Sequence, residues 1–198
     1  MTNKIPTTVN GLIGFSAQII GGATEHGTDI GLVRNTPVNM TADHNALLLK
    51  RDEYEAARAA LTGLYAGLDA ATAAARAFIM QTRDLLKPHL GTRYSSAWIS
   101  TGFNGSLEVR RQPSWQLATL TALAAYLTNN PAREIAELNI TAIRAGEHAD
   151  AVTAAQNAVN TQKGVVKGLW FNRNDALKAL TKRMSDLIAE LKQCLAPN

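Results

Sequence analysis

The residues of this chain that could do chemistry begin with four histidines, and their placement argues against a metal site. His26, His44, His89 and His148 lie in four separate segments. None belongs to a His-Glu-x-x-His motif, and none follows a glutamate at the i+3 position that a di-iron helical bundle requires. His148 follows Glu147 directly, so on a helix the two side chains would point to different faces. We interpret all four as structural or solvent-exposed residues, and we expect no metal ion and no other cofactor.

Nucleophile motifs and phosphate-binding loops are also missing from the sequence. The turn at 102–106 carries Ser106, but no Gly-x-Ser-x-Gly is spelled there. The glycines at 11, 14, 21 and 22 match neither the P-loop nor the dinucleotide-binding fingerprint. Asp52, Glu53 and Glu55 stand beside Lys50 and Arg51, as is typical of charges on a solvated helix. The sequence therefore predicts no catalytic residue, no small-molecule substrate and no enzymatic activity.

The single cysteine and the apolar pattern bear on the compartment. With only Cys194, no intramolecular disulfide is possible, and nothing requires an oxidising environment. Cys194 falls on an apolar row, so we expect it to be buried; the alternative is a reactive thiol or an intermolecular disulfide. No apolar run approaches the roughly 18 residues of a membrane span, and Met1–Pro6 has no signal-peptide pattern. A cytoplasmic protein without a membrane span is expected, with export by a signal-free route left open.

A basic stripe is the feature that most suggests a particular partner. The net charge is +4, and between residues 163 and 183 six basic residues face only Asp175. With Trp170 and Phe171 among them, these side chains could contact phosphates while an aromatic ring stacks. The alternative is an ordinary solvated helix face, which we favour over binding of nucleic acid or an anionic surface. The candidate anion contacts are Lys163, Lys167, Arg173, Lys178, Lys182 and Arg183.

Two long helices must position these groups. From residue 140 to 195, a seven-residue step gives one apolar row and an interleaved row that includes Trp170, which together predict a helical seam. Gly164, Gly168 and the Asn172-to-Asp175 stretch leave open a break near 168–172. The first row contains Ala145, Val152, Val159, Val166, Arg173, Leu180, Leu187 and Cys194.

The other long helix is predicted over 41–87. Thr41 is a plausible N-cap, and Pro88 disfavours the helical conformation of the residue before it. Alanine is abundant between 56 and 77, which favours close helix packing. Gly63 and Gly67, four residues apart, share one face and could admit a crossing backbone.

The first forty residues differ from the rest, since glycine and proline interrupt an apolar pattern. We expect a short helix from Thr8 to Ile20, stopped at Gly21-Gly22, and irregular chain from Ala23 to Met40. This arm either folds back over its own bundle, the interpretation slightly favoured, or docks onto another subunit. The candidate residues for self-association are Val9, Leu12, Ile13, Ile19 and Ile20.

Composition and pattern together favour an all-α fold. Apolar residues make up 46% of the chain and aromatics only 6%, which suits a core of closely packed helices. We predict an elongated helical bundle of two long antiparallel coiled-coil-like helices, with an N-terminal arm (1–40) and a bundle domain (41–198). The bundle comprises a long helix at 41–87, a small helical cap at 88–140 and a long helix at 141–195.

The apolar faces of two helices alone would stay partly uncovered. The sequence therefore suggests a non-enzymatic structural or assembly protein, and a homo-oligomer, that self-associates through helical faces and the arm. The alternative is a helical protein that binds nucleic acid or an anionic surface through the basic stripe.

Overall fold

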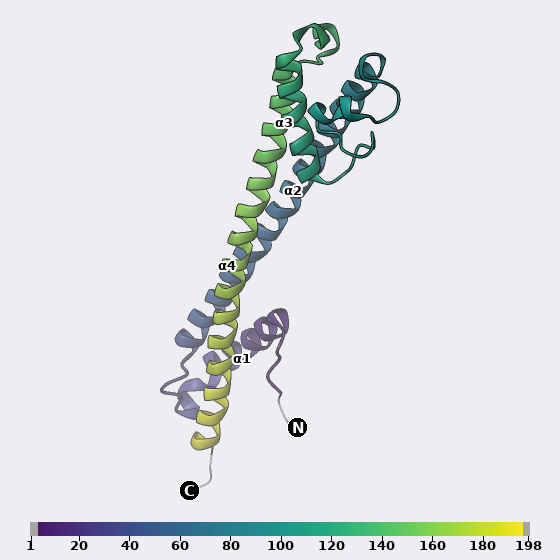
Figure 1. Cartoon of the computed structure of the whole chain (residues 1–198). Helices are drawn as coiled ribbons and strands as arrows, with labels where there is room; N and C mark the ends of the chain where they lie inside the picture. The colour runs from purple at the N-terminus through teal and green to yellow at the C-terminus, as the bar shows by residue number, and fades with distance from the viewer. Residues whose placement is uncertain (1–3, 196–198) are drawn as a thin grey trace. The chain divides into compact units, whose positions relative to one another are not determined.

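All regular secondary structure in the described chain is helical. The computed structural model describes residues 4–195, and within them four α-helices and three short 3-10 helices are present without any β-strand (Figure 1). A single isolated bridge pairs Ile135 with Ile140. The predicted all-α class is therefore confirmed. None of the described helices carries an apolar stretch that is long enough to cross a bilayer.

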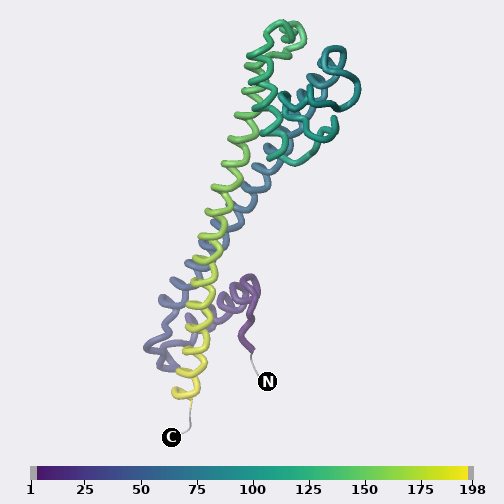
Figure 2. Tube along the Cα trace, in the orientation of Figure 1, coloured from purple at the N-terminus to yellow at the C-terminus, as the bar shows by residue number. Residues whose placement is uncertain are grey.

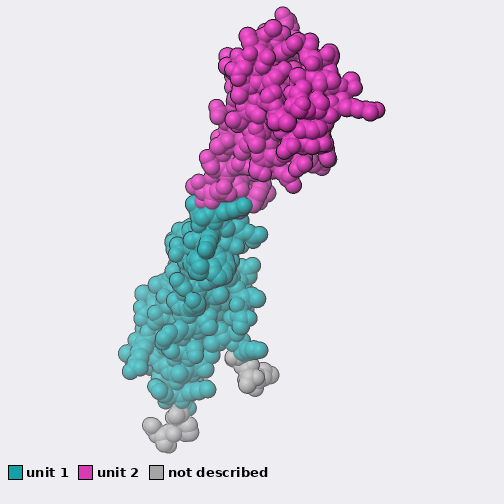
Figure 3. Space-filling view, in the orientation of Figure 1, with its two compact units in different colours: residues 1–60, 163–198 teal, residues 61–162 magenta. Residues whose placement is uncertain are grey.

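The chain divides into two compact units (Figure 3). Unit 1 comprises Met1–Ala60 and Lys163–Asn198, and unit 2 comprises Leu61–Gln162. The two long helices, α2 (Pro37–Leu90) and α4 (Ala142–Cys194), each contribute to both units. The division into an arm and a bundle that the sequence suggested follows different boundaries and stays a prediction.

The first helix is longer than expected. α1 runs from Val9 to Ile30 and passes through Gly21-Gly22, where the sequence predicted its end. Thr8 caps its start by accepting a hydrogen bond from the Gly11 amide at 3.2 Å. Gly31 ends the helix in the left-handed region (φ 81°), where glycine has no steric penalty. The prediction of irregular chain from Ala23 to Met40 is right only for the connection at residues 31–36. The helix continues through Ala23 because Ile19, Ile20 and Ala23 pack against a core, which outweighs the cost of about 1 kcal/mol for each internal glycine.

The second helix begins before Thr41 and ends beyond Lys87. Pro37 occupies its first position, where a missing amide hydrogen costs nothing, and the Thr36 hydroxyl accepts from the Asn39 amide at 3.4 Å. At the other end the helix accommodates Pro88 and reaches Leu90. Gly91 then turns left-handed (φ 97°) and donates its amide to the Lys87 carbonyl. The proline thus marks the last turn of α2 rather than the residue after its end.

The core of unit 1 joins α1 to α2 and α4. Its fully or almost fully buried members are Leu12, Met40, Leu47, Leu180, Met184 and Leu187. The tube view shows α1 lying back against the two long helices of this unit (Figure 2). Leu180 and Leu187 belong to the predicted seven-residue row, and both are buried as expected.

Unit 2 packs α3 (Pro113–Asn129) and the short helix η1 (Ser96–Thr101) against parts of α2 and α4. Trp98, Phe103 and Trp115 form successive edge-to-face ring contacts, with ring centroids 5.6 and 5.8 Å apart. Gly102, with φ 86°, fits here because a Cβ atom would lie 2.9 Å from the Thr119 Cα atom. Two further 3-10 turns, η2 (Pro131–Arg133) and η3 (Ala136–Leu138), lead into α4.

The last helix is continuous. Thr141 accepts from the Arg144 amide at 3.2 Å and so caps the start of α4, and the helix then runs without interruption to Cys194. The break considered near 168–172 does not occur. Two members of the predicted seam were wrongly expected to be buried, since Trp170 is 41% exposed and Cys194 is exposed.

Candidate functional site

Ser16 and His44 have the spacing of a nucleophile and a base, but not the chemistry. The Ser16 hydroxyl lies 2.8 Å from His44 Nδ1, and it donates its hydrogen to the Ile13 carbonyl at 3.0 Å. When the hydroxyl hydrogen goes to Ile13, the oxygen accepts from Nδ1–H, and the imidazole is then a donor to it and not a base. Ser16 is also fully buried, out of reach of a substrate. The pair links α1 to α2.

The other three histidines lie in separate environments. His148 packs against the Phe78 ring at 5.0 Å between centroids, and burial lowers its pKa below the ordinary value. His89 Nδ1 lies 2.6 Å from an Arg133 nitrogen. His26 is an exposed residue beside Glu25. Among residues 4–195 no group of three or more His, Cys, Asp or Glu side chains is arranged to hold a metal ion.

The predicted basic stripe lies on α4, and most of its charges are satisfied within the chain. Arg183 pairs with Asp43, Lys182 with Asp186 at 2.7 Å, and Lys178 with Asp175 at 3.2 Å. Arg173 lies over the Tyr54 ring, 4.4 Å from its centroid, and also contacts Asn174. Lys163 interacts within the chain as well. Lys167 is exposed and forms no ion pair with any described residue.

The candidate residues for self-association lie against the chain's own core. Leu12 is fully buried, and the others pack around the same cluster in unit 1. This placement matches the favoured alternative, in which the arm folds back over its own helices. The residues that pack against the cluster are Val9, Ile13, Ile19 and Ile20.

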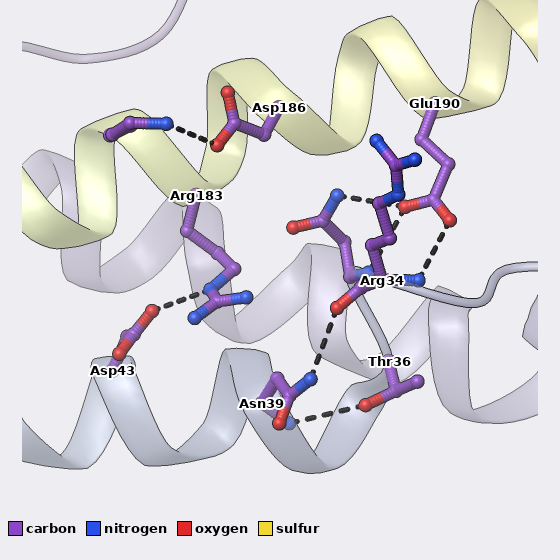
Figure 4. A network of polar contacts seen from close by, with 9 residues as sticks. Arg34, Thr36, Asn39, Asp43, Arg183, Asp186 and Glu190 are labelled. Atoms are coloured by element: carbon purple, nitrogen blue, oxygen red, sulfur yellow. Dashed lines mark hydrogen bonds and ion pairs between the residues drawn. The ribbon is translucent and has the colours of Figure 1, made fainter.

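Glu190 organises a polar network that sequence reasoning missed (Figure 4). One carboxylate oxygen accepts from the amides of Val33 and Arg34 at 2.8 and 2.9 Å. The other accepts from the amide and the side chain of Asn35 at 3.0 and 2.7 Å. The backbone donors of Arg34 and Val33 lower the pKa of Glu190 to about 2. The α1–α2 connection is thereby tied to α4.

This network borders a cavity of about 710 Å³, lined in part by Arg34, Lys182 and Gln193. Most of its charged groups already have partners, since Lys182 pairs with Asp186 and Glu190 binds the loop. Nothing in the local sequence around Glu190 identifies it, because its donors lie more than 150 residues away. We therefore interpret the charged residues of this cavity as part of a structural network and not as a binding site.

Unit 1 also exposes aromatic side chains on one part of α4, which makes this surface a better candidate for binding than the cavity beside Glu190. Trp170 and Phe171 are 41% and 50% exposed, and their rings meet edge to face at 4.9 Å. Gly168 precedes them by less than one turn and Gly164 by nearly two turns, and a Cβ atom at either glycine would meet nothing within 4 Å. We call Gly164, Lys167, Gly168, Trp170, Phe171 and Asp175 the α4 face.

Comparisons with known proteins give no relative for this chain: no family model, no curated protein and no solved structure matches it.

Proposed function

We propose that this chain is a non-enzymatic structural or assembly protein that self-associates through the α4 face. The observation that supports the proposal is the exposed Trp170–Phe171 pair beside two glycines at which an added Cβ would meet no described atom within 4 Å. An internal glycine costs a helix about 1 kcal/mol relative to alanine. A second helix crossing Gly164 and Gly168 would use the room that the missing side chains leave, and would cover the two aromatic rings.

The order of charges on this face suits a second copy of the chain. Lys167, Phe171 and Asp175 are spaced four residues apart, so they share one side of the helix. If two copies of α4 cross antiparallel about a two-fold axis at Phe171, each Lys167 faces Asp175 of the other copy. Gly164 then lies opposite Lys178 of the other copy. The face is thus complementary to itself in both charge and side-chain volume.

In this proposal the N-terminal arm supports α4 within its own subunit. Leu12 and its neighbours hold α4 in position from within unit 1. They would contact a second subunit only by leaving their own core, as in an exchange of α1 between copies. The predicted contribution of the arm to self-association stays a prediction, and loss of assembly after deletion of residues 1–35 would support it.

We also propose that α2 and α4 pair antiparallel in a coiled-coil-like manner inside each unit. In unit 1, Asp43 contacts Arg183 and Tyr54 contacts Arg173, so position numbers rise on one helix as they fall on the other. In unit 2, Phe78 contacts His148. The elongated shape expected from the sequence stays a prediction that small-angle X-ray scattering can test.

The experiment for self-association is light scattering after size-exclusion chromatography. The purified chain should elute as a dimer or larger, and Phe171→Ser should shift it toward monomer. Val38→Ser is the matched control, because Val38 is 76% exposed in unit 1 but lies outside the α4 face. A wild-type chain that remains monomeric at high concentration contradicts the proposal.

A second candidate is binding of nucleic acid or an anionic surface, favoured by the position of Lys167 beside Trp170 and Phe171. A phosphate contact at Lys167 with stacking on the rings is the chemistry involved. The intramolecular pairs of Lys178, Lys182 and Arg183 oppose it, since those charges are partly neutralised. Binding should then weaken steeply with salt and be lost when Lys167, Lys178 and Lys182 are changed to Glu. Indifference to both would exclude this candidate.

A further inference from the structure

Two neighbouring cavities in unit 2 share a cluster of arginines that the proposed self-association does not use. The first, about 440 Å³, is lined by Asp69, Arg76, Arg111 and Gln116 among others. The second, about 510 Å³, is lined by Arg76, Arg110 and Arg111 together with Glu108. Arg76 comes from α2, and Gln116 from the first turn of α3. The segment before α3 supplies Arg110 and Arg111. Three separate segments therefore converge on one basic site.

The side chains of the three arginines have no partner among the described residues. Among residues 4–195, no side-chain hydrogen bond or ion pair involves Arg76, Arg110 or Arg111, and Arg76 Nε is buried without any hydrogen-bond acceptor. Arg83 of the same unit, by contrast, contacts Asp84 and the Leu107 carbonyl. A buried guanidinium N–H without an acceptor is costly, and a bound anion would remove that cost.

Gln116 adds an unused acceptor to these unused donors. Its side chain is only 1% exposed, and its Nε2 donates to the Arg110 carbonyl at 3.2 Å. This bond fixes the orientation of the amide, and Oε1 is left buried without a partner. A ligand that fits the site must therefore offer acceptors to the arginines and one donor to Gln116.

We propose that this site binds a phosphate group in its monoprotonated form. Its unprotonated oxygens accept from Arg76 and Arg111, which line both cavities and whose planar forks match a tetrahedral oxyanion, while Arg110 adds positive charge from the second cavity. The P–OH group donates to Gln116 Oε1. A carboxylate has no donor to give, and sulfate carries no proton at neutral pH, so both should bind more weakly. The group belongs either to inorganic phosphate or to a phosphate monoester of a small molecule.

Calorimetric titration of the full-length chain tests this proposal. Inorganic phosphate and glycerol 2-phosphate are titrated separately, and the tighter of the two identifies the source of the group. Sulfate and acetate are titrated as the comparison anions. Binding of phosphate or its monoester should be roughly tenfold tighter than binding of sulfate, the difference expected for one well-placed hydrogen bond.

Variants place the binding at the arginines. Arg111→Gln changes an exposed side chain, and Arg76→Gln changes the partly buried one; each should weaken binding by roughly tenfold or more. Gln116→Met should abolish the preference for phosphate over sulfate while leaving anion binding in place. Arg93→Gln is the control, an exposed arginine of the same unit outside both cavities, and should bind as the wild type does.

Three results would overturn the proposal. These are the absence of binding at millimolar phosphate, equal affinity for sulfate and phosphate, and equal losses in Arg111→Gln and Arg93→Gln. The last would indicate general screening of positive charge instead of a site. Circular dichroism of each variant separates loss of the fold from loss of binding. If Arg76→Gln unfolds, the affinity of Arg111→Gln for phosphate decides whether the proposal holds. Because none of these residues lies on the α4 face, this result is independent of the oligomeric state.

Discussion

Asp43 on α2 and Arg183 on α4 form an ion pair across 140 residues of sequence, with 2.5 Å between Oδ2 and Nε. Both side chains are more than two-thirds buried, at 27% and 29% exposure. The pair joins the start of α2 to the last third of α4 in unit 1, directly beside the Glu190 network (Figure 4). The coupling energy of this pair therefore measures how strongly α2 and α4 are held together in unit 1.

A double-mutant cycle with Asp43→Ala and Arg183→Ala should give a coupling energy of about 1 kcal/mol in the free energy of unfolding, because partly buried charge-assisted pairs exceed exposed ones. Chemical denaturation of the four proteins measures it. The exposed Lys178–Asp175 pair is the control and should couple much more weakly. Equal coupling in both pairs would mean that burial does not strengthen the Asp43 contact.

Glu190 should make stability depend on acid pH. Its pKa in the folded state, about 2, lies below the ordinary 4.5, so the unfolded chain takes up the proton first as the pH falls. The stabilisation is fully present above about pH 4.5 and is lost as the pH falls toward 2. Glu190→Gln should therefore lower stability at neutral pH and flatten this part of the profile, as measured by thermal unfolding from pH 7 to 2.

The control for Glu190 is Asp29→Asn, which changes an exposed carboxylate near the end of α1 that has no partner among the described residues. This variant should keep the wild-type slope between pH 4.5 and 2. If Glu190→Gln also keeps that slope, the carboxylate does not hold the loop in solution.

Leu180→Ala should destabilise the protein by about 2–5 kcal/mol, since the side chain is fully buried in the core of unit 1. Urea unfolding followed by circular dichroism measures the change. Val38→Ala serves as the comparison and should cost less than about 0.5 kcal/mol because Val38 is largely exposed. A loss at Leu180 no greater than that at Val38 would show that the core is wrongly assigned.

Two glycine substitutions should act in opposite directions on stability. Gly168→Ala should stabilise the monomer by about 0.5–1 kcal/mol, because it lies inside α4 and its Cβ would meet open space. The same change should weaken self-association if a second helix crosses there. Gly102→Ala should destabilise, since its φ is 86° and Thr119 Cα would lie 2.9 Å from the new Cβ. Thermal unfolding at low protein concentration separates the effects on folding from those on assembly.

The sequence predicted the helices better than their ends and surfaces. The seven-residue spacing correctly placed Val152, Leu180 and Leu187 in cores, because burial repeats with the period of the helix. The same spacing misplaced Trp170 and Cys194, since periodicity alone does not tell where a neighbouring helix stops covering a row. Helix propensity predicts that the first helix ends at Gly21-Gly22, because propensity takes no account of the apolar contacts that Ile19 and Ile20 make in the folded chain.

The polar groups were harder to anticipate. The partners of Glu190 and Arg183 lie more than 100 residues away, so no local motif marks them. The basic stripe is evident in the sequence, and so is the Lys182–Asp186 pair four residues apart, whereas the pairing of Arg183 with Asp43 depends on packing. The arginine site of unit 2 also arises only when α2 and the segment before α3 come together. The aromatic pair at 170–171 is evident in the sequence, where Trp170 falls on the predicted seam. The exposure of both rings instead makes the pair a candidate contact surface.

The most direct test of self-association is a charge exchange on the α4 face, read by light scattering after size-exclusion chromatography. Lys167→Glu should give a monomer, because it places two carboxylates opposite each other across the proposed two-fold axis. The double variant Lys167→Glu, Asp175→Lys should return to the wild-type assembly, because opposite charges face each other again. An assembly that persists in Lys167→Glu, or a double variant that stays monomeric while the wild type assembles, would contradict antiparallel pairing through this face.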